Sequence, residues 1–219
     1  MTVIQLAVRD AARAKALLEI LRAEPGWQFP AAVHTVAATR AALIRQAPAL
    51  LLADLRLHDG GMADLVRVAR SARRQAVGQA APLVLLLAEE ETDPMLLDAL
   101  QAGADNFFLL HAHPVAALRQ HVQDTLAGGA DIAPWIARRL LDHFDGHLRS
   151  GGSRGVEDLT NPLSLTAAEH LLLRQLSIGD RLADVARHQG VLPRELTSRV
   201  RDIYRKMQWA LHAGNLRLS

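Results

Sequence analysis

The sequence predicts an α/β unit followed by an all-α unit. Short apolar runs alternate with amphipathic helical patterns through the first 126 residues, and only helical periodicity is found from residue 165 onward. The charge also changes: residues 1–126 carry 12 Lys and Arg against 13 Asp and Glu, whereas residues 127–219 carry 13 against 10. A chain of 219 residues is long enough to form two such domains with separate cores.

Five strands and five helices are expected to alternate in the N-terminal part. The strands are predicted at residues 2–8, 31–36, 50–54, 82–88 and 106–110, and the helices at 10–22, 39–46, 62–76, 93–102 and 114–126. The third to fifth strands are apolar on both faces, which is typical of a buried parallel sheet. Right-handed crossovers then give an open, doubly wound (βα)5 sheet, in which binding groups lie at the carboxyl ends of the strands.

Two acidic residues stand at these strand ends. Asp10 follows the first strand, and Asp54 ends the third. The loop after the first strand, VRDAARAK, has no glycine, so a dinucleotide site or a P-loop is not expected there. The two acids indicate either a shared acidic pocket or ordinary helix caps and loop acids.

Residues 1–126 resemble the receiver domain of bacterial two-component response regulators, which has a flavodoxin-like fold. The segment LLLADLRLHDGGMADLVRVAR is similar to the third strand, phosphoacceptor loop and third helix of that family, and GADNFFLL is similar to its fifth strand. The resemblance implies that Asp54 is the phosphoacceptor, that Asp10 is one of two acids that hold Mg²⁺, and that Phe107 couples the site to the output face. An aspartyl phosphate needs a carboxylate nucleophile, a hard cation and a base that neutralises charge.

The pocket departs from that family where its chemistry requires polar groups. An arginine replaces the second metal-binding acid, leucines replace the hydroxyl residue and the lysine, and a histidine replaces a proline, at Arg9, Leu87, Leu110 and His58 respectively. We expect the Arg9 cation to satisfy the carboxylates of Asp10 and Asp54 in place of Mg²⁺. The prediction is a pseudo-receiver with no catalytic residue, no cofactor and no metal.

A linker with one helix is expected between the two domains. Glycine and proline in residues 127–134 end the α/β pattern, a helix is predicted from 135 to 148, and the glycine-rich residues 150–155 indicate a flexible connector. The predicted division is therefore 1–126 for the receiver-like domain, 127–160 for the linker and 161–219 for a helical domain.

Three helices follow the linker. Thr166 and Glu169 form a capping box for the first, Gly190 ends the second, and Pro193 opens the third. Apolar residues at 196, 200, 203 and 207 line one face of the third helix, and its other face is polar and basic. This pattern predicts a helix-turn-helix whose second helix enters the major groove, although a basic face can also be a solvated helix surface.

Residues 165–207 resemble the LuxR-type DNA-binding domain of the NarL/FixJ regulators, a four-helix helix-turn-helix fold. The resemblance implies contacts to double-stranded DNA from Arg194, Thr197, Ser198, Arg199, Arg201, Arg205 and Lys206. Glu195 and Leu192 depart from the family pattern, and residues 209–215 stand in place of its final helix. The net charge of +4 between residues 194 and 217 falls on this segment.

These features predict a dimeric, DNA-binding transcription regulator that works without conventional phosphorylation. One alternative is an interaction module that pairs with a partner regulator through the receiver-like domain and does not bind DNA productively. Another is a conventional response regulator that a sensor kinase controls through Asp54. The chain has no cysteine and no long apolar run, so we expect a cytoplasmic protein with no membrane partner. No set of nucleophile, base and metal ligands that would form a catalytic cleft can be assembled from its residues, so we expect no enzyme.

Overall fold

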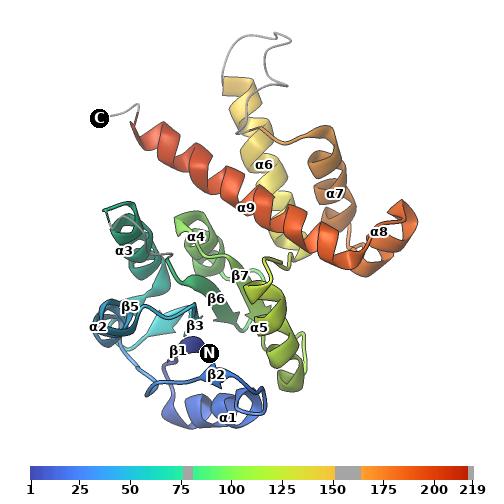
Figure 1. The fold of residues 1–219 in the computed structure, drawn as a ribbon. Coiled ribbons are helices and arrows are strands. Elements are labelled where there is room, and N and C mark those ends of the chain that lie inside the picture. Colours follow the sequence, from blue (N-terminus) through green and yellow to red (C-terminus); the bar gives the residue numbers. More distant parts are fainter. Residues whose placement is uncertain (76–80, 151–163, 217–219) are drawn as a thin grey trace. The chain divides into compact units, whose positions relative to one another are not determined.

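A computed structural model describes residues 1–75, 81–150 and 164–216 (Figure 1). The chain divides into two compact units, Met1–Ala127 (unit 1) and Gly128–Ser219 (unit 2). The expected boundary at residues 160 and 161 and the base Arg217 lie outside the described residues. No helix in the described part of the chain is both long and apolar enough to cross a membrane.

Unit 1 contains a five-stranded parallel sheet with strand order β2-β1-β3-β6-β7. The strands are β1 (Thr2–Ala7), β2 (Trp27–Gln28), β3 (Leu50–Asp54), β6 (Leu83–Ala88) and β7 (Asn106–Leu109). The helices are α1 (Ala11–Leu21), α2 (Val36–Gln46), α3 (Met62–Gln75), α4 (Pro94–Ala102) and α5 (Leu118–Leu126), the last preceded by a 3₁₀ turn, η1 (Val115–Ala117). The predicted doubly wound α/β architecture is confirmed.

One apolar cluster joins the sheet to α1 and α5. Leu6, Leu52 and Leu85 project from three adjacent strands and pack with Leu17 of α1 and Val122 of α5. The helices α2, α3 and α4 form a second, mutually packed layer (Figure 1). The sheet is therefore covered on both faces, which is why its central strands are apolar throughout.

The second strand differs from the prediction. Residues 31–36 were expected to form it, but β2 covers only Trp27–Gln28, and Val33 makes a single isolated bridge to Ala7. The amide of the buried Gln5 donates to the carbonyl oxygen of Ala31 at 3.0 Å, where strand pairing is interrupted. The helix α2 then begins at Val36 rather than residue 39, because Thr35 caps it through the backbone N–H of Ala38.

Unit 2 consists of four helices in its described part: α6 (Pro134–Ser150), α7 (Ala167–Ser177), α8 (Leu182–Gln189) and α9 (Pro193–Leu216). The predicted capping box at Thr166 and Glu169 is present at the start of α7. Gly190 ends α8 in the left-handed region with φ +67°, a conformation that favours glycine. The predicted turn between α8 and α9 is therefore confirmed.

The fourth helix of this unit is not where the sequence predicted it. In the described part of the chain no separate helix follows α9, which runs without a break from Pro193 to Leu216. The fourth member is α6, expected in a linker, which packs on α7 through a buried stripe of Ile136, Leu140 and Phe144. The α9 helix continues past Met207 into the residues that stand in place of the family's final helix.

Candidate functional site

The carboxylate of Asp54 is nearly buried at the carboxyl end of β3, with 8% of its side chain exposed. The backbone N–H of Arg9 donates to its Oδ2 at 2.8 Å. Burial raises the pKa of Asp54 above its ordinary value, while the Arg9 hydrogen bond and the nearby Arg13 charge oppose this shift. Asp54 is thus held by groups from the loop and helix that follow β1.

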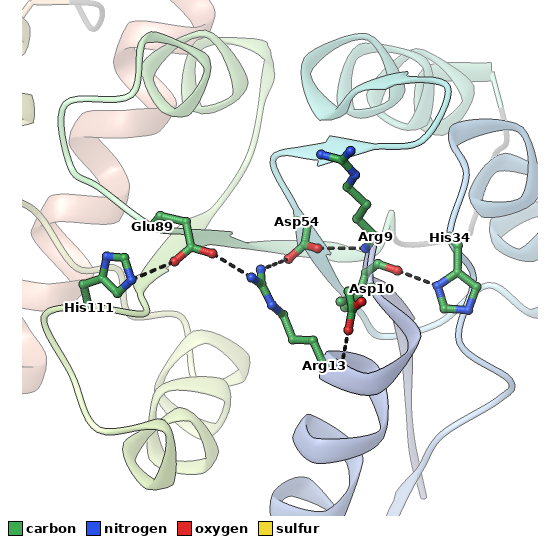
Figure 2. A network of polar contacts seen from close by, with 8 residues as sticks. Arg9, Asp10, Arg13, His34, Asp54, Glu89 and His111 are labelled. Carbon is green, nitrogen blue, oxygen red and sulfur yellow. Dashed lines mark hydrogen bonds and ion pairs between the residues drawn. The ribbon is translucent and has the colours of Figure 1, made fainter.

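A chain of charged groups extends from Asp54 along the same edge of the sheet (Figure 2). Nη1 of Arg13 lies 3.6 Å from Oδ1 of Asp54, and Nη2 lies 2.8 Å from Oε1 of Glu89. Nε2 of His111 lies 3.2 Å from the other oxygen of Glu89. These residues lie on α1, at the end of β3 and in the segments after β6 and β7, so the network spans most of the edge.

The cation beside Asp54 comes from Arg13, whereas the sequence predicted that the Arg9 side chain would supply it. The guanidinium of Arg9 extends away from Asp54 (Figure 2), and only its backbone contacts the carboxylate. Asp10 is the N-cap of α1, because its Oδ1 accepts from the backbone N–H of Arg13 at 2.7 Å. Asp10 therefore acts as a helix cap, which is the second of the two interpretations that the sequence allowed for this residue.

The residues at this edge do not fit a divalent cation. Mg²⁺ requires several oxygen ligands in nearly octahedral geometry. In the described residues, no group of three or more His, Asp or Glu side chains could hold a metal. A guanidinium already lies between the carboxylates of Asp54 and Glu89.

Apolar side chains occupy the two positions that the receiver resemblance assigns to a hydroxyl and an amine. Leu87 belongs to the apolar cluster under α1 and α5, with 3% of its surface exposed, and Leu110 packs against the same cluster. Phe107 is also buried, with 1% exposed. The hydrophobic core therefore reaches the edge of the sheet beside Asp54, where neither leucine can hydrogen-bond to an anion.

The loop after Asp54 is fastened to neighbouring loops. It contains a two-stranded hairpin of β4 (Arg56–Leu57) and β5 (Gly60–Gly61). The backbone N–H of His58 donates to the carbonyl oxygen of His34 at 3.2 Å. Asp59 accepts hydrogen bonds from the backbone N–H groups of Val36 and Ala37, and these bonds lower its pKa. Asp59 thus caps α2 from a distant loop.

Sequence reasoning singled out Asp54 and Asp10 but missed Arg13, Glu89 and Asp59. The sequence did contain a signal for Arg13 and for Glu89. Arg13 lies one helical turn after Asp10, and Glu89 directly follows the fourth strand, in a segment that the strand-end rule already indicated. The capping role of Asp59 depends on a contact across 23 residues, so no local pattern shows it.

The α9 helix is a candidate nucleic-acid interface, and it exposes only part of the predicted contact set. Arg194, Ser198 and Arg205 are exposed along one stripe, which also presents the acids Glu195 and Asp202. Nη1 of Arg205 lies 3.4 Å from Oδ1 of Asp202, one turn earlier in the helix. Thr197 and Arg199 are half-buried. The hydroxyls of Thr197 and Ser198 donate to the carbonyl oxygen of Arg194, at 3.0 and 2.9 Å.

Two predicted DNA contacts are internal side chains. Arg201 is only 6% exposed, and its Nη1 lies 3.6 Å from the position that a Cβ on Gly128 would take. Nζ of Lys206 lies 2.6 Å from Oε2 of Glu169 and 3.1 Å from the carbonyl oxygen of Ser164. These two side chains contact unit 2 itself, because they project from the flanks of α9 where other segments of the unit pack.

No family model matches this sequence, and no curated protein matches it. Solved structures do match. A LuxR-family two-component response regulator from Aurantimonas sp. SI85-9A1 is 21% identical with a TM-score of 0.54, and the match covers 63% of this chain and 94% of that one. A LuxR-family DNA-binding response regulator from Staphylococcus aureus is 10% identical with a TM-score of 0.51, covering 57% and 99%.

The signal receiver domain of a NarL response regulator from Mycobacterium tuberculosis is 18% identical, with a TM-score of 0.51 and coverage of 58% and 97%. Unit 1, with 127 of the 219 residues, accounts for a similar share of this chain. The parallel five-stranded sheet with its flanking helices therefore has the receiver fold. At these identities the likeness concerns the fold alone.

Proposed function

We propose that the chain is a DNA-binding regulator in which unit 2 reads duplex DNA and unit 1 is a receiver-fold module that works without conventional aspartyl phosphorylation. The observation that carries the proposal is the arrangement of α8, Gly190 and α9. A short helix, a left-handed glycine turn and a long helix with exposed polar first turns follow one another directly. A helix-turn-helix presents its second helix in this way.

The exposed groups at the start of α9 suit a duplex. Arg194 and Ser198 lie on the free side of the first two turns, while Leu196 and Val200 hold the opposite side in the core. An arginine can donate to base edges or phosphates, and a serine can do either. We further propose that two copies of the chain bind together, since such modules contact paired half-sites.

The case against phosphate control rests on three features of unit 1. The Asp54 carboxylate is paired with Arg13, the residues around it do not fit Mg²⁺, and apolar Leu87 and Leu110 lie where phosphate contacts are needed. A phosphoryl group formed there would lack the charge stabilisation that its transfer requires. Unit 1 would then act by binding a partner protein, either a sensor kinase or a second regulator.

The DNA proposal is tested by genomic pull-down followed by anisotropy on a recovered fragment. Wild-type affinity is expected to fall steeply between about 50 and 200 mM salt. Arg194→Ala is expected to weaken binding by about 5- to 150-fold, corresponding to about 1–3 kcal/mol for a lost contact. Arg174→Ala removes an exposed base from α7 instead and serves as the matched control. Absence of any duplex affinity at about 50 mM salt contradicts the proposal.

One observation favours a second function, a protein-interaction module. The exposed stripe of α9 carries Glu195 and Asp202 beside its two arginines, and Arg201 and Lys206 are turned inward. Such a mixed face has little net attraction for phosphates. If the duplex experiments fail, capture of a second regulator by unit 1 becomes the function to test.

Phosphorylation is tested separately by incubating the wild-type chain with acetyl phosphate and Mg²⁺. Intact-mass measurement should detect no adduct, because Asp54 has neither a metal site nor a phosphate-binding amine. An adduct that is absent from Asp54→Asn and changes the oligomeric state would establish conventional control instead.

A further inference from the structure

We propose that Arg13 is a resident counter-ion that keeps divalent cations out of the acidic edge at Asp54. The inference rests on the proposed phosphate-independent role of unit 1 and names the residue responsible for it. The Arg13 guanidinium bridges Asp54 and Glu89, at 3.6 and 2.8 Å (Figure 2). Asp54 ends β3, and Glu89 follows the adjacent strand β6. The positive charge therefore lies between the two carboxylates that a cation would have to share.

The placement of this guanidinium is built into the start of α1. Asp10 caps the helix by accepting from the backbone N–H of Arg13, which fixes the backbone of the first turn. Arg13 then stands at the edge of the sheet, and its side chain is 41% exposed against 8% for Asp54. The guanidinium thus covers the Asp54 carboxylate from the solvent side, which is the side from which a metal ion would enter.

A guanidinium and a hydrated metal ion compete for the same carboxylates. Mg²⁺ gives up its water reluctantly and demands several oxygens at fixed angles, whereas the Arg13 guanidinium forms an ion pair with each of the two carboxylates. A divalent ion bound between Asp54 and Glu89 would also be repelled by the Arg13 charge. Without that charge, two neighbouring carboxylates repel each other and favour a cation.

The alternative cause of poor metal binding is the missing acid at position 9. The test therefore supplies that acid with Arg9→Asp in the full chain, alone and combined with Arg13→Gln. Calorimetry then follows titration with Mg²⁺. Arg9→Asp alone should bind Mg²⁺ weakly, and Arg9→Asp/Arg13→Gln should bind it at least about tenfold more tightly, because a repelling charge is gone. Adding Asp54→Asn to the double variant should abolish the binding.

Lys15 provides the matched control, because it is an exposed base on the same helix. Arg9→Asp/Lys15→Gln should behave like Arg9→Asp, since it loses equal charge away from the carboxylates. If Arg13→Gln does not fold, Arg13→Met, which keeps the apolar part of the side chain, takes its place. Far-ultraviolet circular dichroism checks folding.

Two results overturn this proposal. In one, Arg9→Asp alone binds Mg²⁺ as tightly as the double variant; in the other, the folded double variant binds none. Neither result concerns duplex binding, and neither makes wild-type Asp54 a phosphoacceptor. The proposed function fails instead in the salt-dependent anisotropy or in the acetyl phosphate reaction, both of which use the wild-type chain.

Discussion

The carboxyl edge of the sheet in unit 1 and the α9 helix in unit 2 treat their charged residues differently. At the sheet edge, Asp54 is paired with Arg13, and apolar side chains fill the adjacent positions. The α9 helix carries several basic residues. Arg201 and Lys206 project into the unit, and the exposed Arg194 and Arg205 share their stripe with acidic residues. The apolar character of the sheet edge beside Asp54 follows from residue identity, whereas the exposure of each base on α9 depends on which way its side chain faces.

The largest expected effect tests whether Lys206 is structural. Lys206→Ala should lower the free energy of unfolding of unit 2 by about 3 kcal/mol, since it leaves the nearly buried Glu169 carboxylate without its cation. The side chains of this pair are 17% and 10% exposed. Urea unfolding in a Trp27→Phe background measures the change, because the other two tryptophans are in unit 2.

The neighbouring Arg205→Ala provides the comparison for Lys206→Ala. The Arg205 side chain is 50% exposed in its pair with Asp202, so its loss should change stability by less than about 1 kcal/mol. Equal effects at the two positions would remove the distinction between inward and outward bases on α9.

The next effect concerns the apolar edge of unit 1. Leu87→Thr restores a hydroxyl but places it in the cluster beneath α1 and α5, and should cost about 2 kcal/mol. Leu87→Met keeps the volume and should cost less than about 1.5 kcal/mol. Trp27 fluorescence reports unit 1 when Trp135 and Trp209 are replaced by phenylalanine. If threonine is tolerated as well as methionine, the edge is not a packed apolar core.

A smaller effect is expected where α9 continues past Met207. Gln208→Gly should destabilise unit 2 by about 1 kcal/mol and reduce the helical circular dichroism signal at its C-terminal end. Gln208→Ala is the control and should preserve both quantities. An unchanged signal in the glycine variant would mean that residue 208 does not determine the continuity of the helix.

The smallest effect is a pH dependence at Asp54. Its folded pKa lies above the unfolded value because of burial, so the native state binds its proton more tightly. The contribution of Asp54 to stability is therefore present at low pH and is lost as pH rises through the folded pKa. The Asp54→Asn variant should gain stability relative to wild type over that rise, as measured by thermal unfolding across the acidic range. A loss of stability of Asp54→Asn relative to wild type as the pH rises would contradict the raised pKa of Asp54.

Much of the fold could be predicted because it depends on local patterns. The central strands, the Thr166–Glu169 capping box and the turn at Gly190 follow from apolar runs, side-chain capping and glycine. The second strand was misplaced because the carbonyl oxygen of Ala31 accepts from the buried side-chain amide of Gln5, which is 26 positions away. A contact at that separation leaves no periodic signal.

The sequence by itself determined the α/β and all-α divisions, the acid at the end of β3, and the absence of a hydroxyl and an amine beside it. The first two conclusions need only residue type and period, and the third rests on the resemblance to the receiver family. Only the tertiary structure decided that Arg13 rather than Arg9 pairs with Asp54, and that Arg201 and Lys206 face inward. The reason is that a long flexible side chain can reach partners in several directions, and packing against distant segments selects one of them.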